Sequence, residues 1–194
     1  MKQIFREIKN SNYKKCKSIL LENYSEIHAR DDFDNTPLHL AVKNSNYDIC
    51  KLLLEFGADV NACDQWGNCP LHIATQWTGS QRDPLNSRLQ SNPELTEKAK
   101  LFPLTPQAEL TGRASICKLL LDYGAFINAQ NNSDNTSLHY ASYKGFDDLV
   151  ELLLNYNAKI SIRNVFNKTP YDLSRSDEIK NIIKFRIRKY LLFI

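Results

Sequence analysis

The sequence predicts an all-α solenoid, in which helix-turn-helix units are joined by hairpin-like loops and one 34-residue, mostly irregular insertion interrupts the stack. Three observations predict this fold. One short phrase recurs about every 33 residues, two more phrases recur in register with it, and removing residues 78–111 restores the period where it breaks. Self-similarity at a fixed period is typical of repeat proteins, in which each unit buries its apolar residues against its neighbours.

The first phrase predicts the start of the first helix in each unit. Thr-Pro-Leu-His-Leu-Ala at 36–41 recurs as Cys-Pro-Leu-His-Ile-Ala at 69–74, as Thr-Ser-Leu-His-Tyr-Ala at 136–141 and as Thr-Pro-Tyr-Asp-Leu-Ser at 169–174. A threonine hydroxyl accepts hydrogen bonds from the free amides at a helix start, and proline is tolerated in the first turn. The leucine and alanine lie three residues apart on one helical face, which favours their burial.

The second and third phrases predict the second helix and its end. Ile-Cys-Lys-Leu-Leu-Leu occurs at 49–54 and 116–121, and Leu-Val-Glu-Leu-Leu-Leu follows at 149–154. Gly57 and Gly124 come shortly after the first two of these apolar runs, where a left-handed residue closes a helix. The stretch that follows is rich in Asn and Asp, which favour turns.

These phrases together resemble the ankyrin repeat. Its T-P-L-H-x-A signature is matched in full at 36–41 and in part at the three later positions. The resemblance implies a single domain covering the chain, apart from the insertion at 78–111, with atypical outer units acting as caps. We expect five units, at about 1–32, 33–65, 66–132, 133–165 and 166–194.

Two positions of the signature and one helix end depart from the family pattern. Cys69 replaces the capping threonine, and we expect a loss of roughly 0.5–2 kcal/mol from the weaker cap. Asp172 replaces the histidine, where a carboxylate suits the helix dipole. Tyr24 stands where Gly57 closes the next unit, so the first unit should end its helix differently. None of these departures threatens the predicted fold.

The insertion differs in composition from the rest of the chain. Residues 78–111 contain no Ile or Tyr but hold four of the seven prolines, and Thr-Gly occurs at 78–79 and again at 111–112. This pattern resembles in-frame palindromic elements of obligate intracellular bacteria, and the Lys, Ile and Asn bias elsewhere is typical of an AT-rich genome. A short helix is predicted at 94–101. The segment is either a tolerated loop or an added binding element beside the concave face that the ankyrin resemblance implies.

Composition and charge exclude several classes of protein. Hydrophobic residues make up 42% of the chain and the net charge is +3, as in an ordinary folded soluble domain. The five cysteines include no zinc-binding spacing, since Cys63 and Cys69 lie six residues apart. The start of the sequence lacks a secretory signal, and no apolar run is long enough to span a membrane. We therefore expect reduced thiols and a cytoplasmic protein.

The recurring histidines do not predict catalysis or metal binding. His39, His72 and His139 recur at the repeat period, so they should lie roughly 10 Å apart, as neighbouring packed helices do. Ligands of one metal ion all lie near 2 Å from it. The ankyrin resemblance implies instead that each makes structural hydrogen bonds. No serine or cysteine has a recognisable His and acid partner, and there is no phosphate-binding loop. We expect no enzyme activity, cofactor or metal.

The resemblance also implies where a protein partner binds. In ankyrin proteins the hairpin tips and the exposed residues of the first helices form a concave binding face. Large aromatic side chains at such positions are typical of interface hot spots. The alternative is that these rings only cover neighbouring side chains. The expected partner-binding residues are Phe33, Asn35, Lys43, Trp66, Asn68, Trp77, Tyr143, Lys144 and Phe166.

The C-terminal segment leaves a second hypothesis open. Residues 179–194 contain five bases, no acid and several large apolar residues. They form either a last helix packed on the preceding unit or a surface for an anionic membrane or nucleic acid. A third hypothesis is a decaying gene product without a present function. The expected function is that of a monomeric, non-catalytic scaffold with a protein partner. If the source is an intracellular bacterium, proteins of the cell that the bacterium inhabits are candidate partners. No recognisable signal encodes delivery to such a cell, and nucleic acid is not the expected partner.

Overall fold

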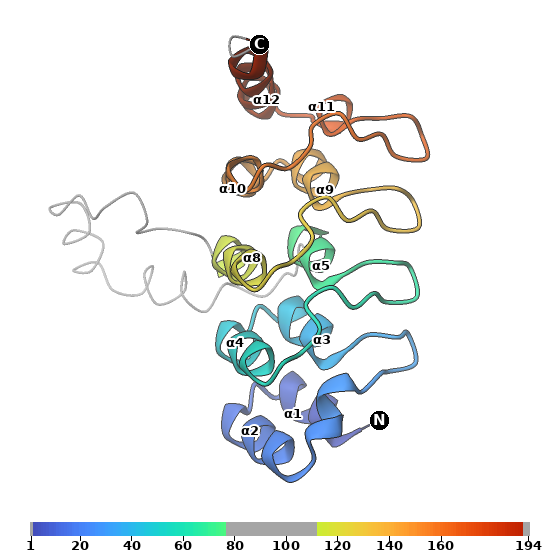
Figure 1. The fold of residues 1–194 in the computed structure, drawn as a ribbon, viewed down its shortest axis with the longest axis vertical. Coiled ribbons are helices and arrows are strands. Elements are labelled where there is room, and N and C mark those ends of the chain that lie inside the picture. The colour runs from blue at the N-terminus through green and yellow to red at the C-terminus, as the bar shows by residue number, and fades with distance from the viewer. Residues whose placement is uncertain (1, 77–111, 192–194) are drawn as a thin grey trace, which may run out of the picture.

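The computed structural model describes residues 2–76 and 112–191, and these form a stack of helix pairs (Figure 1). The first helix of each pair lies in one layer and the second in another, while long loops project from the first layer. The described residues contain helices and no strands, which confirms the predicted all-α ankyrin-like solenoid. The helices are α1 (Gln3–Lys9), α2 (Tyr13–Glu22), α3 (Pro37–Lys43), α4 (Tyr47–Glu55), α5 (Pro70–Gln76), α8 (Gly112–Asp122), α9 (Ser137–Lys144), α10 (Asp147–Asn155), α11 (Pro170–Leu173) and α12 (Asp177–Leu191), with the 3-10 helix η1 (Tyr24–His28) after α2.

The helix starts show the predicted capping chemistry. The Thr36 N–H donates to Nδ1 of His39 at 3.1 Å, and the His39 N–H donates to Oγ1 of Thr36 at 3.4 Å. In the last pair, the Thr169 N–H donates to a carboxylate oxygen of Asp172 at 2.9 Å, so the acid replaces the imidazole as expected. Each reciprocal pair satisfies amides that the helix leaves free.

Cys69 retains half of this arrangement. Its N–H donates to Nδ1 of His72 at 3.1 Å, and its thiol lies 3.1 Å from the same nitrogen. The His72 N–H, however, donates to the Cys69 carbonyl at 2.9 Å. The His139 N–H likewise donates to the Thr136 carbonyl at 3.0 Å, so the cysteine does not cause this bond. Cys69 instead weakens the contact with the ring, because a thiol is a weaker donor than the hydroxyl of Thr136, which lies 2.8 Å from Nδ1 of His139.

Left-handed residues close the second helices, as predicted. Gly57, Gly124 and Asn157 have φ values of 82°, 86° and 63° after α4, α8 and α10. A Cβ at Gly57 would also lie 3.1 Å from the hydroxyl of Tyr24. Helix α2 ends differently, also as predicted, because the chain continues directly into η1.

The first helix pair is offset by one residue from the predicted alignment. Extending the period of 33 to the first unit predicts that Leu21 pairs with Leu54 and is buried like it, but Leu21 is 68% exposed whereas Leu20 is 1% exposed. The N-caps of α2 and α4, Asn12 and Asn46, are 34 residues apart. The expected pairing of Leu21 with Leu54 is therefore wrong. The direct passage from α2 into η1 absorbs the extra residue, so the loops that follow return to the shift of 33.

The helices on either side of the insertion pack together as a pair, as expected for one unit. In three of the other links, those before α2, α4 and α10, the residue Ser11, Ser45 or Gly145 adopts a left-handed conformation. The repeat period therefore predicts that residues 112–116 lead from the link into the second helix. This prediction is wrong, because the equivalent Gly112 is already the first residue of α8. The predicted insertion at 78–111, including its short helix, lies outside the described residues.

The core runs between the two helix layers. Most apolar residues of the two helical phrases are buried, and Leu38, Leu53 and Leu120 are each 0% exposed. Cys50 and Cys117 are also 0% exposed, and burial raises the pKa of the Cys117 thiol to about 12. Such thiols stay protonated and pack as small apolar groups. None of the described helices is long and apolar enough to cross a membrane.

Candidate protein-binding surface on the hairpin face

The loops between units end in tips that are held by their own side chains. At each tip an Asp or Asn side-chain oxygen accepts from the backbone N–H groups two and four residues later. At the second tip, Oδ1 of Asp64 accepts from Trp66 at 2.9 Å and from Asn68 at 2.8 Å. This side-chain turn fixes the backbone locally. The same pattern occurs at Asp31, Asn131 and Asn164.

Neighbouring tips are also joined by backbone hydrogen bonds. The Gln65 N–H donates to the Phe33 carbonyl at 3.1 Å, and the Asn132 N–H donates to the Trp66 carbonyl at 3.0 Å. The Val165 N–H then donates to the carbonyl of Ser133 at 3.2 Å. The four tips form a continuous row in which the backbone is bonded on both sides and the side chains project freely. We call this row, with the exposed residues of α3 and α9, the hairpin face.

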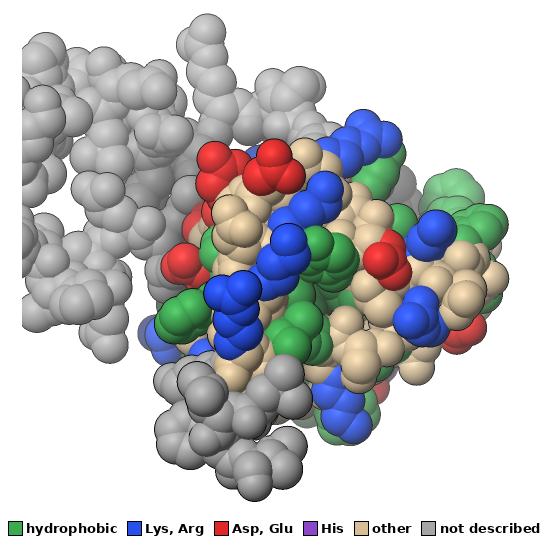
Figure 2. All heavy atoms as spheres, turned by 90° about the horizontal axis from the view of Figure 1, so that it is seen from above, with side chains coloured by type: hydrophobic (Ala, Val, Ile, Leu, Met, Phe, Trp, Pro, Cys, Tyr) green, Lys and Arg blue, Asp and Glu red, His purple; other side chains and the backbone are tan. Residues whose placement is uncertain are grey.

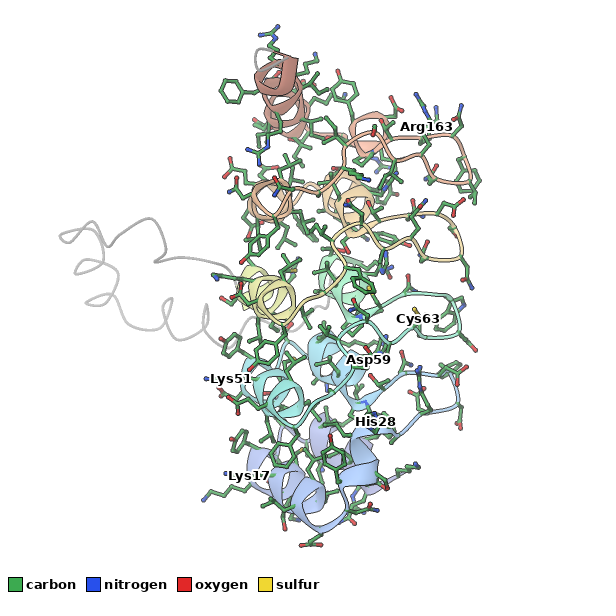
Figure 3. The ribbon with its side chains drawn as sticks, in the orientation of Figure 1. Lys17, His28, Lys51, Asp59, Cys63 and Arg163 are labelled. Atoms are coloured by element: carbon green, nitrogen blue, oxygen red, sulfur yellow. The ribbon has the colours of Figure 1, made fainter. Side chains whose placement is uncertain are left out.

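Figure 3 shows how the two sides of the molecule differ. Arg163 and Cys63 lie on the side where the loops project, whereas Lys17 and Lys51 lie on the opposite side, formed by the second helices. Charge also changes sign along the hairpin face. The first tip carries the exposed Asp32 and Asp34, and the last carries the exposed Arg163 and Lys168.

Aromatic side chains occupy three of the four tips. Phe33 and Trp66 stack with ring centroids 5.9 Å apart and an interplanar angle of 19°. They remain 53% and 51% exposed, so stacking covers only part of each ring. Phe166 is 73% exposed at the last tip, and Ser133 interrupts the aromatic row. This exposed area has no packing role in the core.

Tyr143 lies at the end of α9 and is 43% exposed. The Arg175 guanidinium lies 4.7 Å from its ring centre and donates to its hydroxyl at 3.3 Å. The Lys144 ammonium lies 5.9 Å from the same ring. Cations over a phenol ring attract it electrostatically and hold its orientation. No sequence pattern marks Arg175, because this contact joins two different units.

One predicted contact residue is not available on the surface. Asn68 is 7% exposed, and its amide donates to Asp64 at 3.2 Å. Its carbonyl oxygen accepts from Asn131 at 2.7 Å and from Gln76 at 2.9 Å. The prediction that Asn68 contacts a partner is wrong, because this side chain joins two tips internally.

The other predicted polar residues differ in their exposure. Asn35 is half-buried, and its amide donates to both carboxylate oxygens of Asp31. Lys43 and Lys144 are exposed at the ends of α3 and α9. Trp77 lies outside the described residues. The hairpin face therefore brings together Phe33, Trp66, Tyr143, Lys144, Lys43 and Phe166 from the predicted set.

The recurring histidines are structural. Nε2 of His39 lies 3.0 Å from the Asn68 carbonyl, and Nε2 of His139 lies 3.1 Å from the Lys168 carbonyl, so each ring reaches the next unit. Because Nδ1 accepts from the backbone and Nε2 donates, the rings are neutral. Burial lowers the pKa of His39, His72 and His139. The described residues contain no cluster of three potential metal ligands.

Comparisons with known proteins agree with this architecture. A family model for ankyrin repeats in three copies matches residues 4–86 and 81–164. The mouse B-cell lymphoma 3 protein homolog is 28% identical over 77% of this chain, and the zebrafish palmitoyltransferase ZDHHC17 is 27% identical over 74%. The BRCA1-associated RING domain protein 1 of Caenorhabditis elegans is 40% identical over 39%. The matched regions span 26%, 23% and 11% of these relatives, so the chain covers about a quarter or less of their lengths.

Proposed function

The chain belongs to the ankyrin-repeat family, and we propose that it is a non-catalytic scaffold that binds a protein partner on the hairpin face. Ankyrin repeats generally mediate protein–protein interaction, and the family is generally non-catalytic. We infer a monomer whose binding residues are Phe33, Lys43, Trp66, Tyr143, Lys144 and Phe166, and Trp77 is kept as a predicted contact outside the described residues.

The observation that carries this proposal is the stacked, exposed pair of Phe33 and Trp66. Half of each ring remains exposed to water although both are held in place. A rigid aromatic side chain loses little conformational freedom on binding, so more of its burial is retained as affinity. The hydrogen bonds of Asp31 and Asp64 already order these tips in the free protein, so little conformational entropy is lost when a partner binds.

Charge along the hairpin face predicts the polarity of the partner. Asp32 and Asp34 favour basic residues over the first tip, whereas Arg163 and Lys168 favour acidic residues over the last. Complementary charges set the orientation of a complex and speed its formation. We therefore expect the partner's contact surface to be basic at one end and acidic at the other.

The test compares two double variants with matched loss of aromatic surface. Phe33→Ala with Trp66→Ala removes the stacked pair, and Tyr47→Ala with Tyr123→Ala removes two rings that are each 42% exposed on the second-helix side. Proteins captured from cell lysates by the native chain are quantified by mass spectrometry, and the affinity of the main captured protein is then measured.

The hairpin variant should weaken binding at least 30-fold, as loss of a hot spot does, and the control less than twofold. Both variants should keep the native melting temperature within about 2 °C, since exposed substitutions change stability little. Equal binding by the hairpin variant and the native chain would refute the proposed surface. A large fall in melting temperature of the hairpin variant would mean that the rings serve packing instead.

A further inference from the structure

We propose that the outward side of α12 is a second binding surface, which docks the C-terminal end of the solenoid on an anionic lipid membrane. This surface is separate from the hairpin face and does not depend on the proposed protein partner. It consists of Lys184, Phe185, Ile187 and Arg188.

The packing of α12 determines which residues face outward. Ile179 and Ile183 are 0% exposed against the preceding helices. At about 100° per residue, Lys184, Phe185 and Arg188 fall on the opposite half of the helix. Phe185 is 71% exposed, and Ile187, one turn after Ile183 on the packed side, is still 38% exposed where it borders the outward side. Figure 2, viewed onto this end of the molecule, shows a row of basic side chains with hydrophobic side chains beside it.

The exposure of Phe185 is unusual for its position in the repeat. The equivalent residues of α4 and α8, Leu52 and Leu119, are 2% and 7% exposed within the stack. The equivalent Leu152 of α10 is half-buried. In α12 this position carries a phenyl group that the described residues leave exposed.

The exposed charges of α12 beyond its first turn favour an anionic occupant, while the exposed Glu151 of α10 lines the hollow on the other side of Phe185. Acids of α12 are confined to its first turn, at Asp177 and Glu178, where they suit the helix dipole. Lys180 pairs with Asp177 at 3.8 Å, so the positive charge of this end comes from residues further along the helix. Lys184 and Arg188 are both exposed there.

A second copy of the chain is a poor occupant of this surface. Stacking end to end would place it against the N-terminal end, where Lys2, Lys14 and Lys17 are exposed. Pairing two C-terminal ends would likewise bring positive surfaces together, and like charges at an interface disfavour association. An anionic membrane offers headgroup phosphates to the bases and an apolar layer to Phe185 and Ile187.

This docking would leave the hairpin face available. Helix α12 lies across one end of the stack, whereas the tips run along its length (Figure 1). The solenoid would therefore contact the membrane through one end, and the tips along its length would remain exposed to water. A partner bound to the tips would be held near the membrane without competing for α12.

Binding of the full chain to vesicles tests the proposal. Sedimentation would compare vesicles of phosphatidylcholine alone with vesicles containing 30% phosphatidylserine, across a salt series. The variant Lys184→Gln with Arg188→Gln removes two charges, and Phe185→Ser removes the phenyl group. A matched control, Lys14→Gln with Lys17→Gln, removes two charges from the opposite end. Thermal unfolding of each variant would show whether the fold is retained.

Binding should require phosphatidylserine and weaken with salt. Loss of the two α12 bases should weaken it roughly 25-fold, and Phe185→Ser roughly tenfold, while the control changes it less than twofold. Equal losses in the α12 variant and its control would overturn the proposal, because attraction would then follow net charge. Equal binding to vesicles with and without phosphatidylserine would also overturn it. So would binding to a 20-nucleotide RNA with an affinity that Phe185→Ser leaves unchanged.

Discussion

The neutral histidines between units predict that acid destabilises this fold well above the pH at which its carboxylates titrate. His39, His72 and His139 have lowered pKa values because they are buried. In the unfolded chain a histidine titrates near pH 6.5, so below that pH the unfolded state binds more protons. Stability is therefore fully present above pH 6.5 and falls as the pH decreases toward the lowered values. For a ring that stays neutral to pH 5, the loss reaches about 2 kcal/mol.

For the three rings together, the free energy of unfolding lost at pH 5 has an upper limit of about 6 kcal/mol, which approaches the whole stability of a typical domain. All three rings are almost fully buried, with exposures of 1%, 0% and 1%. Other charges modify the values: Asp64 raises the pKa of His39, and Arg30 lowers it. Asp172 titrates outside this window, because hydrogen bonds from Thr169 lower its pKa below the usual 3.8.

Urea unfolding followed by circular dichroism at pH 7.5, 6.5, 5.5 and 5.0 measures this effect. The free energy of unfolding should be similar at the two higher pH values and fall steeply below 6.5. The variant His72→Gln keeps a side chain that can accept at the helix start but does not titrate, so its pH slope should be shallower. Unchanged stability from pH 7.5 to 5.0, or the same slope in native chain and variant, would refute the assignment of neutral rings.

Four other substitutions test three separate parts of the fold. Cys69→Thr should raise the free energy of unfolding by about 0.5–1 kcal/mol, because a hydroxyl bonds to the His72 ring more strongly than a thiol does, and a lower melting temperature would contradict this. Leu53→Ala, at a 0% exposed site, should lower the free energy of unfolding in urea by about 2–5 kcal/mol. Leu21→Ala, at a 68% exposed site, should lower it by less than about 0.5 kcal/mol. Similar losses in the two variants would contradict the offset of the first unit. Gly67→Ala should lower the melting temperature, because its φ is 74° and its Cβ would lie 2.4 Å from an oxygen of Asn132; an unchanged melting temperature would mean that the tips are not rigid.

Periodicity predicts those parts of the fold that each unit determines for itself. The pairing of Thr36 with His39 needs only three residues of one helix, and the left-handed closure at Gly57 needs only the end of another. The single-residue offset of Leu21 could not be predicted in this way. It depends on how α2 passes into η1, and the sequence there lacks the glycine that fixes the alignment elsewhere.

The error at Asn68 has a different physical origin. An amide at a tip can either face a partner or bond within the stack, and its own sequence is the same in both cases. The choice is made by Asn131, one unit away, which donates to the Asn68 oxygen at 2.7 Å. A residue whose partner lies in another unit cannot be assigned from the pattern of its own unit. The Arg175 contact with Tyr143 has the same origin.

The separation of backbone and side chain at the tips explains how one scaffold can carry different contact residues. At each tip the hydrogen bonds involve backbone groups and an Asp or Asn two residues earlier, as Asp31 does for Phe33. The tip side chain takes no part in these bonds, so Phe33, Trp66 and Ser133 occupy the same conformation although they differ in size and polarity. The proposed binding specificity at the tips would therefore be independent of folding, whereas the Asp and Asn positions are not free to vary. The family relationship consequently identifies the scaffold, and only the side chains along the row can identify the partner.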